Sequence, residues 1–500
     1  MPAMDDQPLV YIRRDISGGI NTRESGTNVT DTQVINLVNA DIGTPGQVTK
    51  RPGNDSIATL SATAQTIAPF QPISGTNQIV AAYSTNVATS TGGSFTDRKT
   101  NFTATTAPAL IQGGESGEGD VLFVGNGTDN WFRMNQSYTF QDLGNTNTSP
   151  PIGNVGTYYR SRLWILKSNL LYWSDAYDDD YSGAFDRTAN NFNMPVGTEM
   201  AILGLREEGL ICFGSNRVYG INPSAVPAAT DKPELLYERG CIAGRTVVQA
   251  GDDVYFMSQD GIRGLFRSQQ DKLQVGSSNP VSYNIKDQWD SLSWAYITKA
   301  CAVYFDNKIF FSVPVNASTT NNQVWVYYPA TKGWVVISGW NVSSFAKVTI
   351  SGQEKLYGTD SVSGKVYQLW TANDDDGTAI AYTEESRKDD LGQPLVTKYG
   401  GYLKIRMYSA GSYTVNVFAS VDDAGYIRLG DITTPGSGTA LPLTLPFTLT
   451  SSGVTEASFP LDDLGPWKYI QIKLTHPDIN TDEIKILERN LLTYGDEYTP

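Results

Sequence analysis

A short phrase recurs along the middle of the chain: one or two turn-forming residues, then an aliphatic residue, then an aromatic residue. Copies occur at 169–172, 216–219, 252–255 and 307–310. Each copy lies in a short run rich in Val, Ile, Leu and aromatic residues, bounded by Gly, Asn, Asp and Ser, which is typical of antiparallel strands joined by hairpin turns. The phrase returns in blocks of roughly 35 to 45 residues, and this spacing predicts a β-propeller, a ring of four-stranded sheets.

Seven such blocks can be cut between residues 57 and 386, and six blades are the alternative because the first block is weakly patterned. The clearest block predicts four strands, at Ala300–Phe305, Lys308–Val313, Gln323–Tyr328 and Trp334–Ile337. In the last block we expect Ala379–Thr383 to be the fourth strand. Two β-sandwiches would also use aromatic-rich hairpins, but they rarely repeat one phrase this often.

The chain on either side of the propeller follows other patterns. Residues 1–56 read as an extended N-terminal arm, with N-cap chemistry at residues 30–33 that predicts one short helix over Thr32–Val38. Beyond Asp374–Asp376 the apolar residues alternate, as in Leu403, Ile405 and Met407. This two-residue period predicts half-buried antiparallel strands, and residues 387–500 are therefore expected to form a β-sandwich. The fold class is all-β.

Charge and composition narrow the possible functions. Acidic residues outnumber basic residues by 52 to 37, giving a formal net charge of −15. Such a surface repels phosphate, so a protein that grips nucleic acid over a wide face is not expected. We expect no secretory signal and no membrane span, because no apolar stretch is long enough. The three cysteines lack CxxC spacing and are expected to be buried thiols of a protein made in a reducing cytoplasm.

Residues that could carry catalysis are scarce. The only histidine, His476, is expected to be an exposed structural residue, and one histidine is a poor basis for a catalytic triad or a zinc site. The Asp178–Asp180 and Asp374–Asp376 triplets are interpreted as solvated loops, since an EF-hand counted from Asp374 needs glycine where Ala379 stands. P-loop and Asp-box motifs are absent. We therefore expect no enzyme activity, no cofactor and no metal.

The N-terminal arm contains a Gly-Gly-Ile-Asn phrase, an Asn-rich segment and an Arg-Pro-Gly turn. The residues in and around these motifs, which are candidates for an assembly element, are Gly18, Gly19, Asn21, Arg23, Asn36, Asn39, Asp41, Arg51, Pro52 and Gly53. Through them the arm resembles the opening of the β-propeller tail nozzle or tail hub proteins of short-tailed bacteriophages.

The resemblance implies a structural protein of the virion tail, assembled in the host cytoplasm. It implies a ring of identical subunits, expected to be a hexamer, that contacts an adaptor and tail fibres and through which DNA passes without specific binding. Acidic side chains on the channel wall would keep the DNA mobile. The candidates for that wall are Glu115, Glu118, Asp120, Asp178, Asp179, Asp180, Asp374, Asp375, Asp376, Asp422 and Asp423.

A receptor-binding or glycan-binding tail protein is the alternative function. Such a protein would expose a cluster of Trp and Tyr with carboxylates at one end of the propeller. The stretch Tyr172–Tyr177, which contains Trp173 and Asp175, is the sequence candidate for this cluster, and packing at a strand end is the other interpretation of it.

Overall fold

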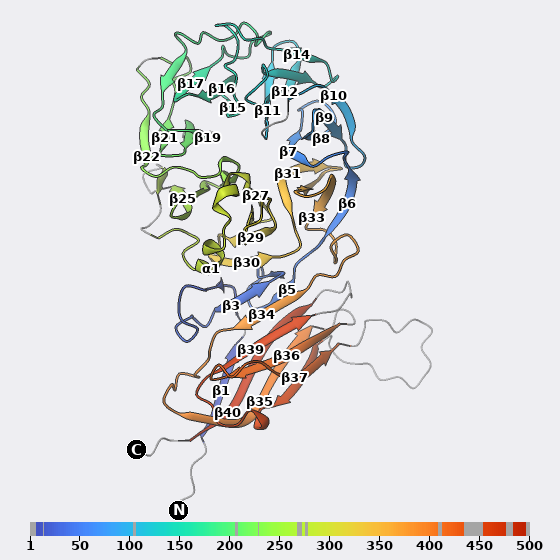
Figure 1. Ribbon diagram of the computed structural model, residues 1–500, viewed down its shortest axis with the longest axis vertical. Coiled ribbons are helices and arrows are strands. Elements are labelled where there is room, and N and C mark those ends of the chain that lie inside the picture. The colour runs from blue at the N-terminus through green and yellow to red at the C-terminus, as the bar shows by residue number, and fades with distance from the viewer. Residues whose placement is uncertain are drawn as a thin grey trace, which may run out of the picture.

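The computed structural model describes residues 7–13, 15–103, 107–205, 209–228, 230–267, 273–275, 279–408, 413–434, 454–476 and 484–496. Within these residues the chain forms a β-propeller and a second all-β domain joined to one side of it (Figure 1). The predicted all-β fold class is confirmed.

The propeller has seven four-stranded antiparallel blades within the described residues. Blades 1 to 3 contain β7 (Ala64–Phe70), β8 (Gln78–Tyr83), β9 (Asn86–Ser90) and β10 (Thr96–Lys99); β11 (Ala109–Glu115), β12 (Gly119–Gly125), β13 (Phe132–Asn135) and β14 (Phe140–Asp142); and β15 (Gly156–Tyr159), β16 (Arg162–Lys167), β17 (Leu170–Trp173) and β18 (Asn191–Asn193). Blades 4 and 5 contain β19 (Glu199–Leu205), β20 (Gly209–Gly214), β21 (Val218–Ile221) and β22 (Glu234–Tyr237); then, after the 3-10 helix η1 (Gly244–Thr246), β23 (Val248–Ala250), β24 (Asp253–Ser258), β25 (Gly261–Arg267) and β26 (Leu273–Val275).

The sixth blade follows the helix α1 (Lys286–Asp290) and the 3-10 helix η2 (Trp294–Lys299). Its strands are β27 (Cys301–Phe305), β28 (Lys308–Val313), β29 (Gln323–Tyr328) and β30 (Gly333–Ile337), within a residue of the predicted bounds. The hairpins of this blade are short and local, so the sequence pattern alone was sufficient to place them.

The seventh blade closes the ring with a strand from the other end of the chain. β31 (Val342–Ile350), β32 (Gln353–Asp360) and β33 (Lys365–Leu369) are followed in the sheet by β6 (Asn54–Thr59), which pairs antiparallel with β33. The prediction that Ala379–Thr383 supplies the fourth strand, and the boundaries at residues 56 and 386 that depended on it, were wrong. The propeller extends from β6 to β33. Pairing of this N-terminal strand with the last blade closes the ring and prevents it from opening.

The second domain contains two sheets, and the N-terminal arm contributes to both. One sheet has the order β38 (Val454–Pro460), β35 (Thr397–Tyr408), β40 (Lys485–Asp496), β5 (Val48–Lys50) and β4 (Ala40–Asp41), with β1 (Gln7–Arg13) also paired to β40. The other contains β3 (Gln33–Val38), β34 (Tyr382–Ser386), β39 (Ile470–His476), β36 (Thr414–Val421) and β37 (Ile427–Thr433), and β2 (Gly19–Ile20) pairs with β3. The 3-10 helix η3 (Asp462–Leu464) follows β38 in the chain.

The predicted helix at Thr32–Val38 is wrong, because these residues form the strand β3. β3 lies parallel to β30 of blade 6 at Val38–Val336 and antiparallel to β34 of the second domain. One continuous sheet therefore runs from a propeller blade into the second domain. The Thr and Asp side chains before β3 cap turns as readily as helices, and the run of Val, Ile and Leu that follows them favours a strand.

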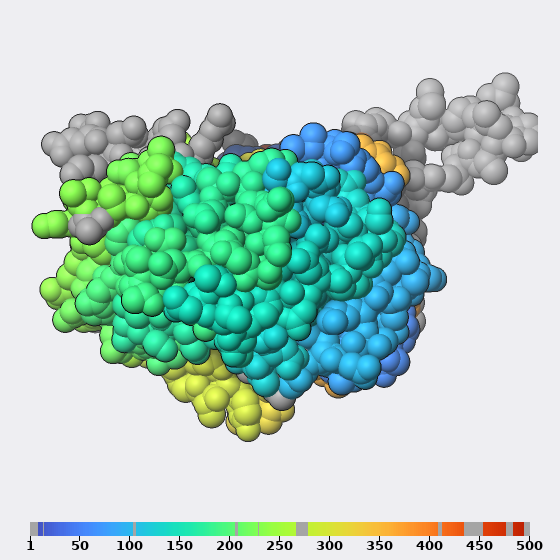
Figure 2. All heavy atoms as spheres, turned by 90° about the horizontal axis from the view of Figure 1, so that it is seen from above, coloured from blue at the N-terminus to red at the C-terminus, as the bar shows by residue number. Residues whose placement is uncertain are grey.

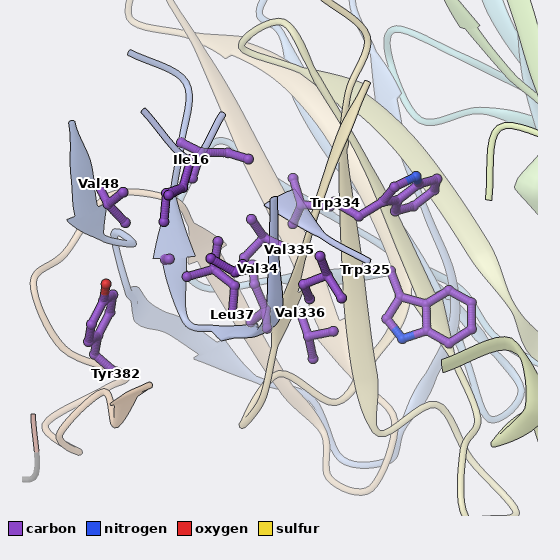
Figure 3. Close-up of a cluster of buried hydrophobic side chains, with 14 of the residues drawn as sticks. Ile16, Val34, Leu37, Val48, Trp325, Trp334, Val335, Val336 and Tyr382 are labelled. Carbon is purple, nitrogen blue, oxygen red and sulfur yellow. The ribbon is translucent and has the colours of Figure 1, made fainter. Parts of the chain in front are cut away.

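The joint between the domains is packed like a domain core. Figure 3 shows Val34 and Leu37 of the arm beside Val335 and Val336 of blade 6, with Tyr382 of the second domain near them. All of these side chains belong to one buried cluster that extends from the fifth blade to the C-terminal strands. A large apolar joint of this kind disfavours relative motion of the two domains.

Candidate functional site

Arg51 occupies the centre of the joint between the propeller and the second domain. Its guanidinium makes a two-pronged ion pair with Asp375, Nη1 to Oδ1 at 2.9 Å and Nη2 to Oδ2 at 2.7 Å. The remaining N–H groups donate to the side chain of Asn39 and to the carbonyl groups of Pro52 and Ser338. All five donors of this buried side chain thus have acceptors, as a buried charge requires.

Aromatic and carboxylate groups complete the same site. The guanidinium carbon of Arg51 lies 4.6 Å from the centre of the Trp340 ring, and the indole N–H of Trp340 donates to Asp375 Oδ1 at 2.9 Å. Nearby, the hydroxyl of Tyr328 donates to Asp41 at 2.8 Å. Burial, together with this carboxylate, raises the pKa of Tyr328 well above its usual value.

Asn39 connects three segments of chain at the joint. Its backbone has φ 57°, and its side-chain amide donates to the hydroxyl of Ser338 and to the carbonyl of Ala381. Its side-chain oxygen accepts from Arg51 and from the backbone N–H of Ser338. A left-handed backbone position with four side-chain hydrogen bonds suits asparagine better than other residues.

Two glycine positions of the arm exclude any side chain. A Cβ added to Gly53 would lie 1.7 Å from the backbone oxygen of Asp374, and Gly53 donates its N–H to Ala372 O at 2.5 Å. Gly19 has φ 64°, and an added Cβ would lie 2.4 Å from backbone atoms of Trp334. Both glycines therefore allow the arm to lie directly against other backbone segments.

Of the remaining arm candidates, Gly18 and Asn21 flank β2, Arg23 follows them in the chain and Asn36 lies on β3. The N–H of Gly18 donates to Thr32 O at 2.9 Å, and buried Asn21 donates to the side chain of Gln33 at 2.8 Å. Arg23 stacks over the Tyr283 ring at 3.9 Å. Asn36 lies opposite Glu385 at an irregular point of the β3–β34 pairing. The candidate assembly residues thus form intramolecular contacts with the rest of the chain.

The structure brings two of the predicted acidic loops together, between blades 2 and 3. Buried Glu115 lies 2.8 Å from Arg133 Nε, and the N–H of Ser116 donates to the carbonyl of Asp178. Burial raises the pKa of Glu115 to about 7, outweighing the opposite effect of Arg133. In the first loop, Glu118 accepts a hydrogen bond from Asn135 at 2.8 Å, and Asp120 accepts one from the N–H of Ile73 at 2.7 Å. In the second loop, Gln141 and Ser182 donate to Asp180, and Asp179 is exposed.

The other predicted acids lie elsewhere, and three of them are paired with cations, whereas Asp374 and Asp422 accept hydrogen bonds from backbone N–H groups. Asp374–Asp376 lies beside β6: Asp375 pairs with Arg51, and Asp376 pairs with Lys365 at 2.7 Å, whose hydrogen bond lowers the pKa of Asp376. Asp422 and Asp423 belong to a turn of the second domain, where Lys388 pairs with Asp423 at 2.6 Å. Of the loop 374–376, which was interpreted as solvated, Asp376 is exposed and Asp374 is half-buried, whereas Asp375 is held by buried Arg51.

No cluster of three or more His, Cys, Asp or Glu side chains suited to a metal occurs in the described part of the chain. His476 is buried, contrary to expectation, and its Nδ1 lies 2.7 Å from the carbonyl of Thr414. The three cysteines are buried, as predicted, and burial raises the pKa of Cys212 to about 12. Among the described helices, none is long and apolar enough to cross a membrane.

The propeller surrounds a cavity of about 920 Å³ to which all seven blades or the segments before them contribute. Arg245 in η1 forms hydrogen bonds at this cavity with blade 1, with blade 7 and with the segment before blade 6. It donates to the carbonyl groups of Gln65 and Ser343, each at 3.0 Å, and to that of Lys299 at 2.7 Å.

The sequence candidate for an exposed aromatic cluster is wrong in its central residue. Trp173 is buried, and its ring stacks on Phe192 with centres 4.4 Å apart. Tyr177 of the same stretch is 49% exposed, and the other exposed aromatic residues include Trp294 and Tyr296 of η2. Periodicity could not identify them, because they lie in an irregular connection between two blades.

Comparisons with known proteins do not assign this chain to a family. No protein-family model matches the chain, and no curated protein matches it. Among solved structures, the extracellular domain of the hybrid two-component system BT4673 of B. thetaiotaomicron is similar at 12% identity and TM-score 0.43, over 63% of this chain and 39% of that one. A second structure, of the extracellular domain of the one-component system BT4673, is similar at 11% identity and TM-score 0.41, over 81% of this chain and 58% of that one. This chain thus spans less than two thirds of either. YCF48 from Cyanidioschyzon merolae matches at 11% and 0.39, over 64% and 98%.

Proposed function

We propose that this chain is a structural subunit of a short-tailed bacteriophage tail, of the nozzle or hub type, and that it works by shape. In this proposal identical subunits, six in number, form a ring around the path of the ejected DNA. One observation carries the proposal: the residues that give the arm its resemblance to these proteins also hold the propeller against the second domain. These residues are Gly19, Asn39, Arg51 and Gly53.

The joint supports a role in which force passes through the subunit. A continuous sheet and a shared core connect the two domains, so a ring built from such subunits would keep its geometry while DNA passes. The adaptor and the tail fibres are the proposed partners, and the tail of the virion is the proposed location.

The distribution of acids supports one part of the chain as the channel wall. Asp375, Asp376 and Asp423 are paired with cations, so their charge is offset locally. The loops between blades 2 and 3 place Glu118, Asp178 and Asp179 near one another with Arg133 as the neighbouring cation. This region is therefore the better candidate for repelling DNA.

Mass photometry of the purified full chain, alone and mixed with the other tail proteins of its virion, tests the ring. We expect a species of six times the chain mass of 54.5 kDa in at least the mixture. An Arg51→Met variant should lose this species, whereas Lys347→Met, which alters an exposed ion pair, should keep it. A chain that stays monomeric in both samples would contradict the proposal.

A further inference from the structure

One tryptophan of this chain is exposed without an evident reason in the fold. Of the ten tryptophans, Trp294 alone is classed as exposed, with 46% of its surface accessible, and Tyr296 beside it is 38% exposed. Trp289 of α1 meets Trp294 edge to face, with ring centres 5.7 Å apart. Large aromatic rings are normally covered, so an exposed pair on one short segment marks an interaction site.

Hydrogen bonds hold this segment in place. The N–H of Ser293 donates to Pro314 O at 2.9 Å, and Lys299 Nζ donates to Thr319 O at 2.8 Å. The carbonyl of Lys299 accepts from Asn321 at 2.9 Å and from Arg245 at 2.7 Å. The rings are therefore presented by a preorganised segment, which lowers the entropic cost of binding.

The aromatic segment adjoins the central cavity of the propeller. Thr298 and Lys299 line that cavity, together with Thr320 and Asn321 from the β28–β29 connection. Asn321 is 1% exposed, and within the described chain its Oδ1 has no hydrogen-bond donor. Figure 2 shows yellow chain, the colour of blade 6, projecting beyond one face of the propeller. The 3-10 helix η2, which carries the two aromatic residues, thus continues directly into the polar wall of the cavity.

We infer that this surface, made by Trp294, Tyr296 and the adjoining polar wall of the cavity, binds a polysaccharide. One face of a sugar ring is made of C–H groups and lies well on the electron-rich face of an aromatic ring. The hydroxyls at the rim of the sugar need hydrogen-bond partners, which Thr298, Thr320 and Lys299 supply.

A protein partner fits this surface less well. The exposed large hydrophobic side chains near this surface in the sequence are Tyr283, Trp294, Tyr296 and Val362, which follows Ser361 of the cavity wall. Arg23 covers the ring of Tyr283, and Lys299 Nζ lies 5.3 Å from the centre of the Tyr296 ring. These few side chains make a small apolar area, whereas the core of a stable protein interface is a broader one.

Affinity electrophoresis of the purified full chain tests the inference without any ring assembly, so its result is separate from that for the tail proposal. Native gels would contain dextran, galactomannan, alginate or delipidated lipopolysaccharide. We expect at least one polysaccharide to retard the protein, Trp294→Ala to weaken the apparent affinity at least tenfold, and Trp294→Phe to retain part of it. Tyr402→Ala, which removes an exposed aromatic ring of the second domain, is the matched control and should bind as the wild type does.

Two results would overturn the inference. The first is that none of the four polysaccharides retards the wild type, or that Trp294→Ala is retarded equally. The second is that Trp294→Ala leaves binding intact but changes the oligomeric mass of the protein, which would assign the aromatic surface to contacts between copies of this chain.

Discussion

At the scale of single residues, replacing Arg51 is expected to have a large effect on stability. Methionine at this position would leave Asp375 partly buried without its cation and would remove one of the two donors to the Asn39 side-chain oxygen. Breaking a buried pair in this way typically costs about 3 to 5 kcal/mol. Chemical denaturation should show this loss, whereas Lys347→Met, at an exposed pair, should cost no more than about 1 kcal/mol. Equal losses would contradict the role assigned to Arg51.

Glu115 gives a prediction about pH. Its pKa is raised from 4.5 to about 7 in the folded protein. Between these values the unfolded chain releases the proton while the folded chain keeps it, so stability contributed by Glu115 falls as pH rises through this window and is constant above it. The melting temperature of the wild type should therefore fall relative to Glu115→Gln between about pH 5 and 7. A parallel pH profile for wild type and Glu115→Gln would contradict the prediction.

Sequence analysis found Arg51 and Gly53 as candidates but could not assign their roles. Arg51 and Asp375 are 324 positions apart, and no local pattern links two residues at that separation. The run of three aspartates at 374–376 instead led to the interpretation of Asp375, together with Asp374 and Asp376, as part of a solvated loop. His476 follows Ile470, Ile472 and Leu474 at two-residue spacing, so the alternation did place it on the apolar face of its strand, where it contacts Tyr413 and Thr414.

At the scale of elements, the closing strand β6 depends on the turn that precedes it. Because a Cβ at Gly53 would overlap the backbone of Asp374, we expect Gly53→Ala to displace β6 and to destabilise the protein by at least about 2 kcal/mol. Gly93→Ala is a suitable control, since nothing lies within 4 Å of an added Cβ there, and it should change stability by no more than about 0.5 kcal/mol. Thermal unfolding of both variants measures this, and similar melting temperatures would show that the turn tolerates a side chain.

The strands that the sequence predicted well and those that it missed differ in the range of their contacts. Blade 6 consists of successive hairpins, so the turn residues and alternating apolar runs define it locally. β6 and β3 are short strands whose antiparallel partners, β33 and β34, lie hundreds of residues away. The capping chemistry before β3 favoured a helix locally, and pairing with β30 and β34 overrode that preference.

At the scale of the whole molecule, the joint makes the propeller and the second domain one body. The arm supplies strands to both sheets of the second domain and the closing strand of the propeller, so it is a connector within the subunit as well as a proposed assembly element. The repeated hairpin phrase predicted the propeller from sequence. The exposed Trp294 and the division of the acids among three separate regions depended on tertiary structure.

Cryo-electron microscopy of the virion tests the central claim most directly. The account predicts tail density for the propeller and the second domain in a fixed relative orientation, repeated six times around a channel that holds DNA. Absence of this protein from the tail, or a single copy lying away from the channel, would contradict it.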